Sequence, residues 1–282
     1  MRTLEICVWI HLFDYKNGQH VVKINSYEKN GWISFPYSCA LNKWAKKVEE
    51  IVSAQIIKIP EGDKDLRCGG TWFPGVNFLN NKRNGDVDGA FFPEELKSFI
   101  VENEPAFDAV FDKAQISICY PGYPKKMKAE SSKAFKFRTD RFSAHIDGIL
   151  PLGQGRRRFL KEYHSFILGI PINSTSNKAS PCVIWEGSHA IVRDAFKKYK
   201  EIQNVDTWDT HDITDFYNKL RSKIFNQCIA KTIWVPVGHA YLIHRLSLHG
   251  ILPWKDNTKQ KSGRMVAYFR PDLFQGQINW LK

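Results

Sequence analysis

The feature that most constrains the fold of this chain is a series of short, strand-like segments that begins near residue 114. Each segment is about 6 to 10 residues long and is bounded by Gly, Pro or polar turns. Several, such as FILGIPI and TIWVPVG, are apolar and β-branched. We expect strands at 114–120, 141–150, 163–172, 181–186, 231–237, 239–249 and 263–270. A helical stretch at residues 189–227 interrupts the series, and the pattern predicts an antiparallel sandwich or jelly roll.

The first hundred residues have a different texture. Apolar residues recur every three to four positions within 38–54, which predicts an amphipathic helix, and Pro93 followed by two Glu marks the start of another. Residues 62–90 are rich in Gly, Asn and Asp and are predicted to be loop. We find no linker and expect one domain over 1–282, with a supporting region at 1–109 and a jelly-roll core at 110–272 that carries a helical insert at 190–227.

The composition is that of an ordinary globular protein with a basic surface. Hydrophobic residues make up 43% and charged residues 25% of the 282 residues, and the net charge is +12. The charge fits a solvated surface, and it also fits attraction to an anionic substrate or to a nucleic acid. The basic residues fall in short clusters, of which Arg156, Arg157 and Arg158 follow the candidate site closely and could steer an anionic substrate.

The cysteines and the N-terminal segment predict a cytoplasmic protein. No two of the six Cys share a C-x-x-C spacing, so a structural zinc site is not expected and the thiols suit a reducing compartment. The apolar N-terminal segment is interrupted by Glu5, His11 and Asp14, which makes it a poor signal peptide and too short to cross a membrane. We expect no membrane association.

The segment SAHIDGIL places His145 and Asp147 one residue apart. On a strand, residues i and i+2 point to the same face, so the imidazole and the carboxylate could bind one metal ion. The alternative is a hydrogen-bonded pair at the surface. A metal site needs a third ligand, and two His with one carboxylate are typical of non-haem Fe(II) oxygenases.

The third ligand is expected in the segment GHAYLIHRLSLHGILPW. His249 is preferred because it ends an apolar strand and precedes Gly250, which lets the backbone come close to a bound group. His244 is the fallback, and His239 shares the strand parity of His249. Taken alone, each of these histidines could equally be a core or surface imidazole.

An oxygenase of this kind also needs a cation for the distal carboxylate of a keto acid. Arg264, in SGRMVAYFRP, lies among apolar neighbours where a guanidinium needs a partner. Arg270 lies six residues further on with the same parity. The alternative for Arg264 is an exposed charge at a strand end.

Taken in order, His-x-Asp, SPCVIWEGSH, VPVGHAYLIHRLSLHG and the arginine on the next strand resemble the phytanoyl-CoA dioxygenase-like family of Fe(II)- and 2-oxoglutarate-dependent oxygenases. The resemblance covers about residues 110–272. It implies a double-stranded β-helix (cupin-like) core with flanking helices, Fe(II) held by His145, Asp147 and His249, 2-oxoglutarate on Arg264, and O2 as oxidant. The reaction implied is hydroxylation of a small molecule with release of succinate and CO2. Related halogenases replace the carboxylate by a small residue, and here Asp147 is present.

Three further residues are expected to bind or line the cofactor pocket, namely Tyr120, His164 and Trp185. Core packing is the alternative role for each of them. The chain departs from the family at Glu186, where Pro is usual, and at His239, where Asp is common. These departures leave the triad intact but give no basis for transferring a substrate.

Two other functions remain open at this point. Nucleic-acid demethylases of the same superfamily carry two arginines with the spacing of Arg264 and Arg270, although the WEGSH segment and the long separation between Asp147 and His249 fit them less well. A non-catalytic jelly-roll binding protein is the other alternative. Hydrophobic, acyl-CoA, amino-acid and small-metabolite substrates all suit the sequence, which also leaves the oligomeric state open.

Overall fold

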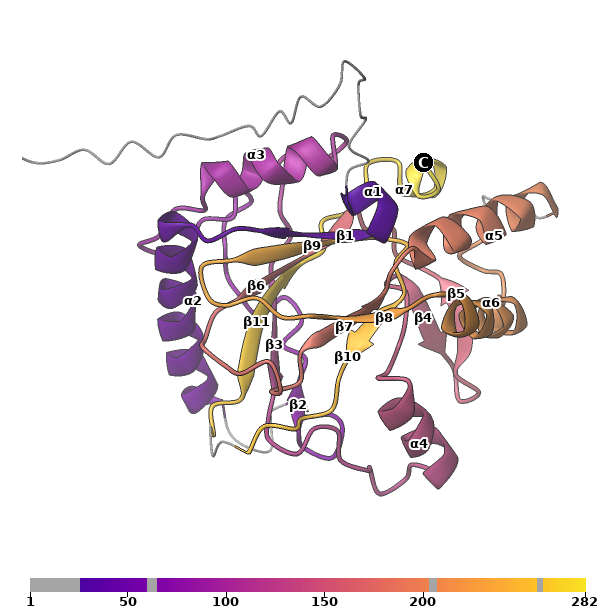
Figure 1. Ribbon diagram of the computed structural model, residues 1–282, viewed down its shortest axis with the longest axis horizontal. Helices are drawn as coiled ribbons and strands as arrows, with labels where there is room; N and C mark the ends of the chain where they lie inside the picture. The colour runs from indigo at the N-terminus through magenta and orange to yellow at the C-terminus, as the bar shows by residue number, and fades with distance from the viewer. Residues whose placement is uncertain (1–25, 60–64, 203–206, 258–260) are drawn as a thin grey trace, which may run out of the picture.

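The computed structural model describes residues 26–59, 65–202, 207–257 and 261–282 (Figure 1). The expectations for the N-terminal segment fall on residues 1–25 and lie outside this part of the chain. Among the described residues, no helix combines the length and apolar character needed to cross a bilayer.

The largest sheet has six antiparallel strands. Their order across the sheet is β1 (Trp32–Phe35), β9 (Ala240–His244), β6 (Phe166–Pro171), β11 (Arg264–Phe269), β3 (Gln115–Cys119) and β2 (Trp72–Phe73). Both edge strands, β1 and β2, come from the first hundred residues, while the four central strands come from the later part of the chain. The N-terminal region therefore completes the sheet as well as packing against it.

A second, three-stranded sheet faces the first. It consists of β10 (His249–Ile251), β7 (Cys182–Trp185) and β8 (Ala230–Ile233), and a hairpin of β4 (Ile149–Leu152) and β5 (Arg157–Leu160) lies beside it. One cluster of buried side chains takes Ile184 and Ile233 from the small sheet and Tyr241, Val266 and Tyr268 from the large sheet. The two sheets thus share an inner core, and the predicted jelly-roll, or double-stranded β-helix, is confirmed.

Helices cover the outer face of the large sheet. The principal one is α2 (Cys39–Lys58), which begins where the Ser38 hydroxyl accepts a hydrogen bond from the Leu41 amide at 3.1 Å. Leu41, Trp44 and Val48 are fully buried on one stripe of this helix, as the spacing predicts. These side chains and those of α3 (Glu94–Asn103) pack against the outer face of the large sheet and form the largest core cluster with it. The short helix α1 (Ser26–Asn30) precedes β1.

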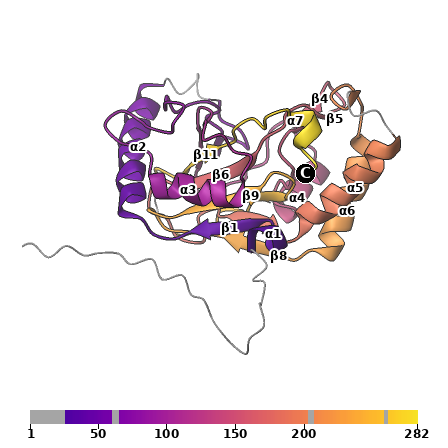
Figure 2. The ribbon, with the colours of Figure 1, turned by 90° about the horizontal axis from the view of Figure 1, so that it is seen from above.

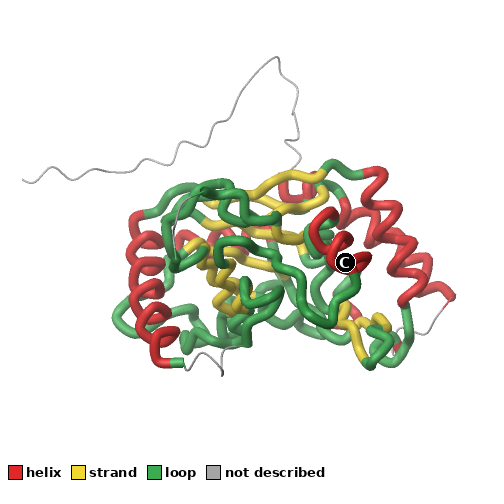
Figure 3. Tube along the Cα trace, turned by 90° about the horizontal axis from the view of Figure 1, so that it is seen from below, coloured by secondary structure: helices red, strands yellow, loops and turns green. Residues whose placement is uncertain are grey.

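The predicted helical insert forms two helices at the opposite end of the molecule, α5 (Ser188–Ile202) and α6 (Thr214–Gln227) (Figures 2 and 3). They pack over the outer side of the small sheet, where Val183 and Trp185 join side chains of α6 such as Tyr217. The short C-terminal helix α7 (Gly276–Asn279) ends near them. Helix α4 (Ser132–Asp140), which the sequence pattern did not predict, lies just before the candidate site.

Two predicted strands differ from the observed structure. The run 239–249 divides into β9 and β10, separated by a turn at 245–248, so strand parity does not relate His239 to His249. Only the end of the run 141–150 is a strand, because Phe142 and Ser143 adopt positive φ angles of 55° and break the extended backbone. Both interruptions lie next to the candidate metal ligands.

Candidate active site

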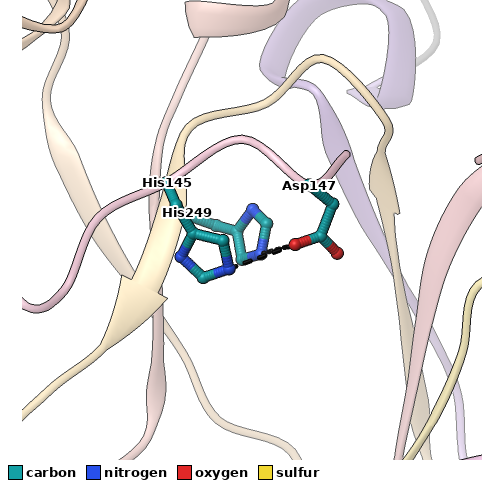
Figure 4. Close-up of side chains that lie close together, drawn as sticks. All are labelled: His145, Asp147 and His249. Atoms are coloured by element: carbon teal, nitrogen blue, oxygen red, sulfur yellow. Dashed lines mark ion pairs between the residues drawn. The ribbon is translucent and has the colours of Figure 1, made fainter. Parts of the chain in front are cut away.

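Two distant segments bring His145, Asp147 and His249 together between the sheets (Figure 4). His145 and His249 form an isolated antiparallel bridge, in which each backbone N–H donates to the other residue's carbonyl, with N to O distances of 2.9 and 3.0 Å. One ligand atom from each of the three side chains lies within 4.8 Å of the other two. The Asp147 Oδ1 atom is 3.1 Å from His145 Nε2 and 3.7 Å from His249 Nε2.

A close backbone contact holds the two segments at this distance. A Cβ atom at Gly250 would lie 2.3 Å from the Phe142 carbonyl oxygen, so any larger residue would push the segments apart. The Phe142 carbonyl also accepts a hydrogen bond from the Ile251 amide at 3.0 Å. The expectation that Gly250 makes room for a bound group is therefore replaced. Gly250 makes room for the neighbouring backbone, and the contact fixes the spacing of the two histidines.

Both imidazoles are oriented in the same way by their own chain. His145 Nδ1 lies 3.0 Å from the Ser143 carbonyl oxygen, and His249 Nδ1 lies 3.0 Å from the Ser247 carbonyl oxygen. Because a carbonyl only accepts, each Nδ1 acts as the donor in these contacts, which leaves each Nε2 facing Asp147 as the ring nitrogen placed to bind a metal. The sequence holds a signal for this arrangement, since both ligands occur in a Ser-x-His tripeptide, SAH and SLH.

Asp147 is held by Arg270, a largely buried arginine that follows directly after β11 of the large sheet. Arg270 Nε donates to Asp147 Oδ2 at 2.5 Å, and its Nη1 donates to Gln115. Burial alone would raise the pKa of Asp147, but the positive charge of Arg270 holds it well below its usual value. The carboxylate is therefore ionised, with Oδ2 occupied and Oδ1 turned to the histidines.

The site is asymmetric in its exposure to solvent. The His145 side chain is 44% exposed, whereas those of Asp147 and His249 are 10% and 6% exposed. Burial lowers the pKa of His249 to about 4, with Asp147 opposing the shift, so this imidazole is neutral and can bind a metal. The triad thus opens to solvent along His145.

The donor set fits a divalent metal. Bonds of about 2.1 Å at right angles would separate adjacent ligand atoms by about 3 Å, close to the observed spacing of Asp147 Oδ1 from the two Nε2 atoms. Three neighbouring donors occupy one side of such an ion and leave the other side for exchangeable ligands. The arrangement therefore suits a divalent metal ion that keeps positions open for other ligands.

Arg264, at the start of β11 in the large sheet, lies on the inner face that looks toward the small sheet. It is 5% exposed, and its Nη2 donates to the Cys119 sulfur at 3.8 Å. Its buried Nε has no hydrogen-bond partner, and no described carboxylate pairs with it. A permanently charged guanidinium in this setting has room for one more acceptor, which a ligand carboxylate would supply.

Two tyrosines that the sequence reasoning missed lie beside Arg264. The hydroxyls of Tyr241 and Tyr268 are 2.8 Å apart, and burial raises the pKa of both. They therefore remain protonated and can donate to an anion next to Arg264. Tyr268 shares the strand parity of Arg264 in RMVAYF, which is a signal that could have identified it.

The other residues predicted from the sequence do not join the triad or the group formed by Arg264, Tyr241 and Tyr268. The Tyr120 ring packs against the core outside the large sheet, and Trp185 packs against Phe142 and Phe225 outside the small sheet. Side chains alternate between the two faces of a strand, so a side chain that packs on the outer face does not line the space between the sheets. Neither Tyr120 nor Trp185 therefore fits the predicted role of lining the inner pocket. His164 is nearer, since Asp147 influences its pKa, and its Nε2 lies 3.2 Å from Glu162. The fallback ligand His244 lies elsewhere, 3.0 Å from Arg193.

A cavity of about 580 Å³ is lined by residues of the same two segments, although none of the three triad residues lines it. Phe142 and Leu252, each three residues from a histidine ligand, line it together with Pro181 and the side chains of Lys178 and Lys255. Its volume suits a small-molecule ligand.

Comparison with known proteins gives weak similarity to solved structures only. No family model and no curated protein matches the chain. SnoK, a non-heme alpha-ketoglutarate-dependent carbocyclase from nogalamycin biosynthesis, is 12% identical with a TM-score of 0.44, over 90% of this chain and 87% of that chain. AviO1 from Streptomyces viridochromogenes is 11% identical with a TM-score of 0.46, over 88% and 92%. HygX from Streptomyces hygroscopicus, solved with nickel, 2-oxoglutarate and hygromycin B, is 10% identical with a TM-score of 0.38, over 88% and 86%.

Proposed function

We propose that this chain is a non-haem iron, 2-oxoglutarate-dependent dioxygenase that hydroxylates a small-molecule substrate. The observation that carries the proposal is the convergence of two Nε2 atoms and one carboxylate oxygen, on side chains that are each fixed by a second hydrogen bond. Ligands that are oriented by partners of their own are typical of metal centres and are not needed in a simple surface pair.

The residues divide the work between metal, cosubstrate and orientation. His145, Asp147 and His249 would hold the iron, which when bound supplies the activation of O2 for coupled oxidation of 2-oxoglutarate and substrate. Arg270 keeps Asp147 ionised and limits it to one ligand oxygen. Arg264, with the hydroxyls of Tyr241 and Tyr268, would bind the distal carboxylate of 2-oxoglutarate.

Hydroxylation is the proposed outcome because the triad retains its carboxylate. A halide ligand would need the coordination position that Asp147 occupies, and Arg270 holds Asp147 in place. Arg270 is the second of the two arginines whose six-residue spacing is shared with nucleic-acid demethylases. Here it pairs with Asp147, in the loop that carries His145 and Asp147 (the metal loop). That pairing supports a role in the iron site and leaves no need for a nucleic-acid contact to explain Arg270.

The test is spectroscopic and needs no substrate. The metal-free protein is titrated anaerobically with Fe(II) and then with 2-oxoglutarate, and a weak visible charge-transfer band is expected for the wild type. His145→Ala should show no band, while Arg264→Gln should bind Fe(II) normally and require far more 2-oxoglutarate. A folded wild-type protein that gives no band under these conditions would refute the assignment and favour a binding protein.

If the band forms, a substrate screen follows in air. Release of succinate above the uncoupled background identifies a substrate, and one added oxygen atom in the product by mass spectrometry establishes hydroxylation. A product that is cyclised, epimerised or desaturated without added oxygen would contradict the hydroxylase proposal while leaving the iron site intact.

A further inference from the structure

Two guanidinium groups without a carboxylate partner lie against one buried tyrosine next to the metal loop. The Arg221 guanidinium carbon is 4.8 Å from the centroid of the Tyr217 ring, and that of Arg158 is 6.0 Å from the same centroid. Arg158 comes from β5 and Arg221 from α6, so the tertiary fold brings them together. Within the described residues, neither forms an ion pair with Asp or Glu.

Other basic side chains nearby differ from Arg158 and Arg221 because they have acidic partners. Arg157 is paired with Asp212, and Lys161 lies 4.0 Å from Asp209. Arg158 instead has two positive neighbours, since Arg221 and Arg156 follow burial among the causes that lower its pKa. Among the described residues, Arg221 donates to the Asn218 side chain and the Ala144 carbonyl, and its buried Nε has no partner there. Partly buried like charges that lack a counter-ion destabilise the free protein and favour binding of an anion.

Hydrogen bonds connect this pair to the metal ligands. The Tyr217 hydroxyl accepts from the Ile146 amide at 3.1 Å, and Ile146 lies between His145 and Asp147. Arg221 Nη1 donates to the carbonyl of Ala144, the residue before His145, at 3.4 Å. A ligand held by Arg221 would therefore lie beside the loop that carries two of the three metal ligands. His145 in that loop is also the most exposed member of the triad.

We propose that Arg158 and Arg221 bind a phosphate group of the substrate, so that this oxygenase acts on a phosphorylated small molecule. The statement that the phosphate belongs to a substrate rests on the proposed function, whereas the anion site itself is inferred from the arginine pair alone. Two planar guanidinium forks offer paired donors that match phosphate oxygens, and a phosphate dianion balances two charges where a single carboxylate balances one. The Tyr217 ring keeps both stems in place, which lowers the entropic cost of binding.

Binding of inorganic phosphate to the metal-free protein tests the site without iron, 2-oxoglutarate or turnover. Calorimetric titration at low salt should show saturable binding at one site. Arg158→Gln and Arg221→Gln should each weaken it by about tenfold or more, as expected for the loss of a charge-assisted contact. Lys219→Gln is the matched control. It removes the same charge from α6, but Lys219 is exposed and two residues from Arg221, on the other side of the helix, so affinity should be retained.

Two further variants separate this site from its surroundings. Arg264→Gln should leave phosphate binding unchanged, because a loss would place the phosphate in the cosubstrate pocket and overturn the proposal. Arg158 makes no side-chain bond to the metal loop, so its variant stays informative if Arg221→Gln disturbs folding. The absence of saturable phosphate binding, or full affinity in Arg158→Gln, would show that the arginines only stack on Tyr217.

The substrate part is tested by succinate release with matched phosphorylated and dephosphorylated candidates. Turnover is expected with a phosphorylated compound only, with a KM raised at least about tenfold in Arg158→Gln and a retained charge-transfer band. A substrate that lacks any phosphate group and is turned over equally by Arg158→Gln would overturn it. Loss of the band with intact phosphate binding would instead refute the oxygenase assignment, so the two failures are distinguishable.

Discussion

Replacing Asp147 by Ala should destabilise the metal-free protein far more than replacing its neighbouring ligand His145. Asp147 is the only carboxylate that pairs with Arg270 among the described residues, and their side chains are 10% and 19% exposed. Removing one partner of a buried ion pair costs about 3–5 kcal/mol, because the other charge stays buried. Arg270 keeps its bond to Gln115 and its contact with the Tyr268 ring, so we expect a loss of about 3 kcal/mol.

The comparison with His145 makes the prediction specific. The His145 side chain is 44% exposed, and its Nδ1 makes one hydrogen bond to a backbone carbonyl, so His145→Ala should cost about 1 kcal/mol. For a chain of 282 residues, a loss of about 3 kcal/mol lowers Tm by roughly 5 °C and a loss of about 1 kcal/mol by roughly 2 °C. Both variants should lose iron binding, since each removes one of three ligands.

The assay is equilibrium denaturation in the presence of a chelator, with the double variant Asp147→Ala/Arg270→Met as the decisive control. Removing both charges should restore at least half of the stability lost in Asp147→Ala, because no unpaired charge remains buried. If Asp147→Ala is as stable as His145→Ala, or if the double variant is no more stable than Asp147→Ala, the pair does not have the energetic role assigned to it.

Three other predictions concern Arg264, Gly169 and Asp112. Arg264→Gln should weaken 2-oxoglutarate about a hundredfold and leave Fe(II) affinity unchanged, as measured by titration of the charge-transfer band, and equal 2-oxoglutarate affinity would exclude Arg264 from the cosubstrate site. Gly169→Ala places a Cβ 2.3 Å from the Tyr241 ring, so it should cost about 2 kcal/mol and weaken 2-oxoglutarate, whereas an unchanged Tm would contradict the packing. Burial raises the pKa of Asp112 to about 6, so the native state binds more protons than the unfolded state and loses stability as pH rises from about 4 to 6. Asp112→Asn should remove this dependence and gain about 2 kcal/mol over the wild type at pH 7, and parallel stability curves from pH 4 to 7 would disprove it.

How far the site could be read from sequence differs between its parts. His145, Asp147 and His249 were identified by residue type, order and family resemblance, but the parity argument behind them does not hold. Both histidines lie at breaks in the strands, and their distance is set by the Gly250 contact between segments about a hundred residues apart. Such a contact leaves no local periodicity in either segment, so no pattern of neighbours could predict it.

Arg264 and Arg270 illustrate the same division. Their shared parity on β11 was readable, because side chains alternate along any strand, and it correctly puts both on the inner face with Tyr268. Their different roles were not readable. Arg270 meets Asp147 and Arg264 does not, since that depends on how the small sheet lies over the large one.

The sequence alone determined the jelly-roll architecture, the helix 39–58 and the residue types able to bind a metal, because these depend on local periodicity and side-chain chemistry. Only the tertiary structure decided that Trp185 faces the outer core, that β1 and β2 close the edges of the large sheet, and that Arg158 and Arg221 share one tyrosine. Those outcomes depend on which distant surfaces pack together, and packing is a property of the whole folded chain.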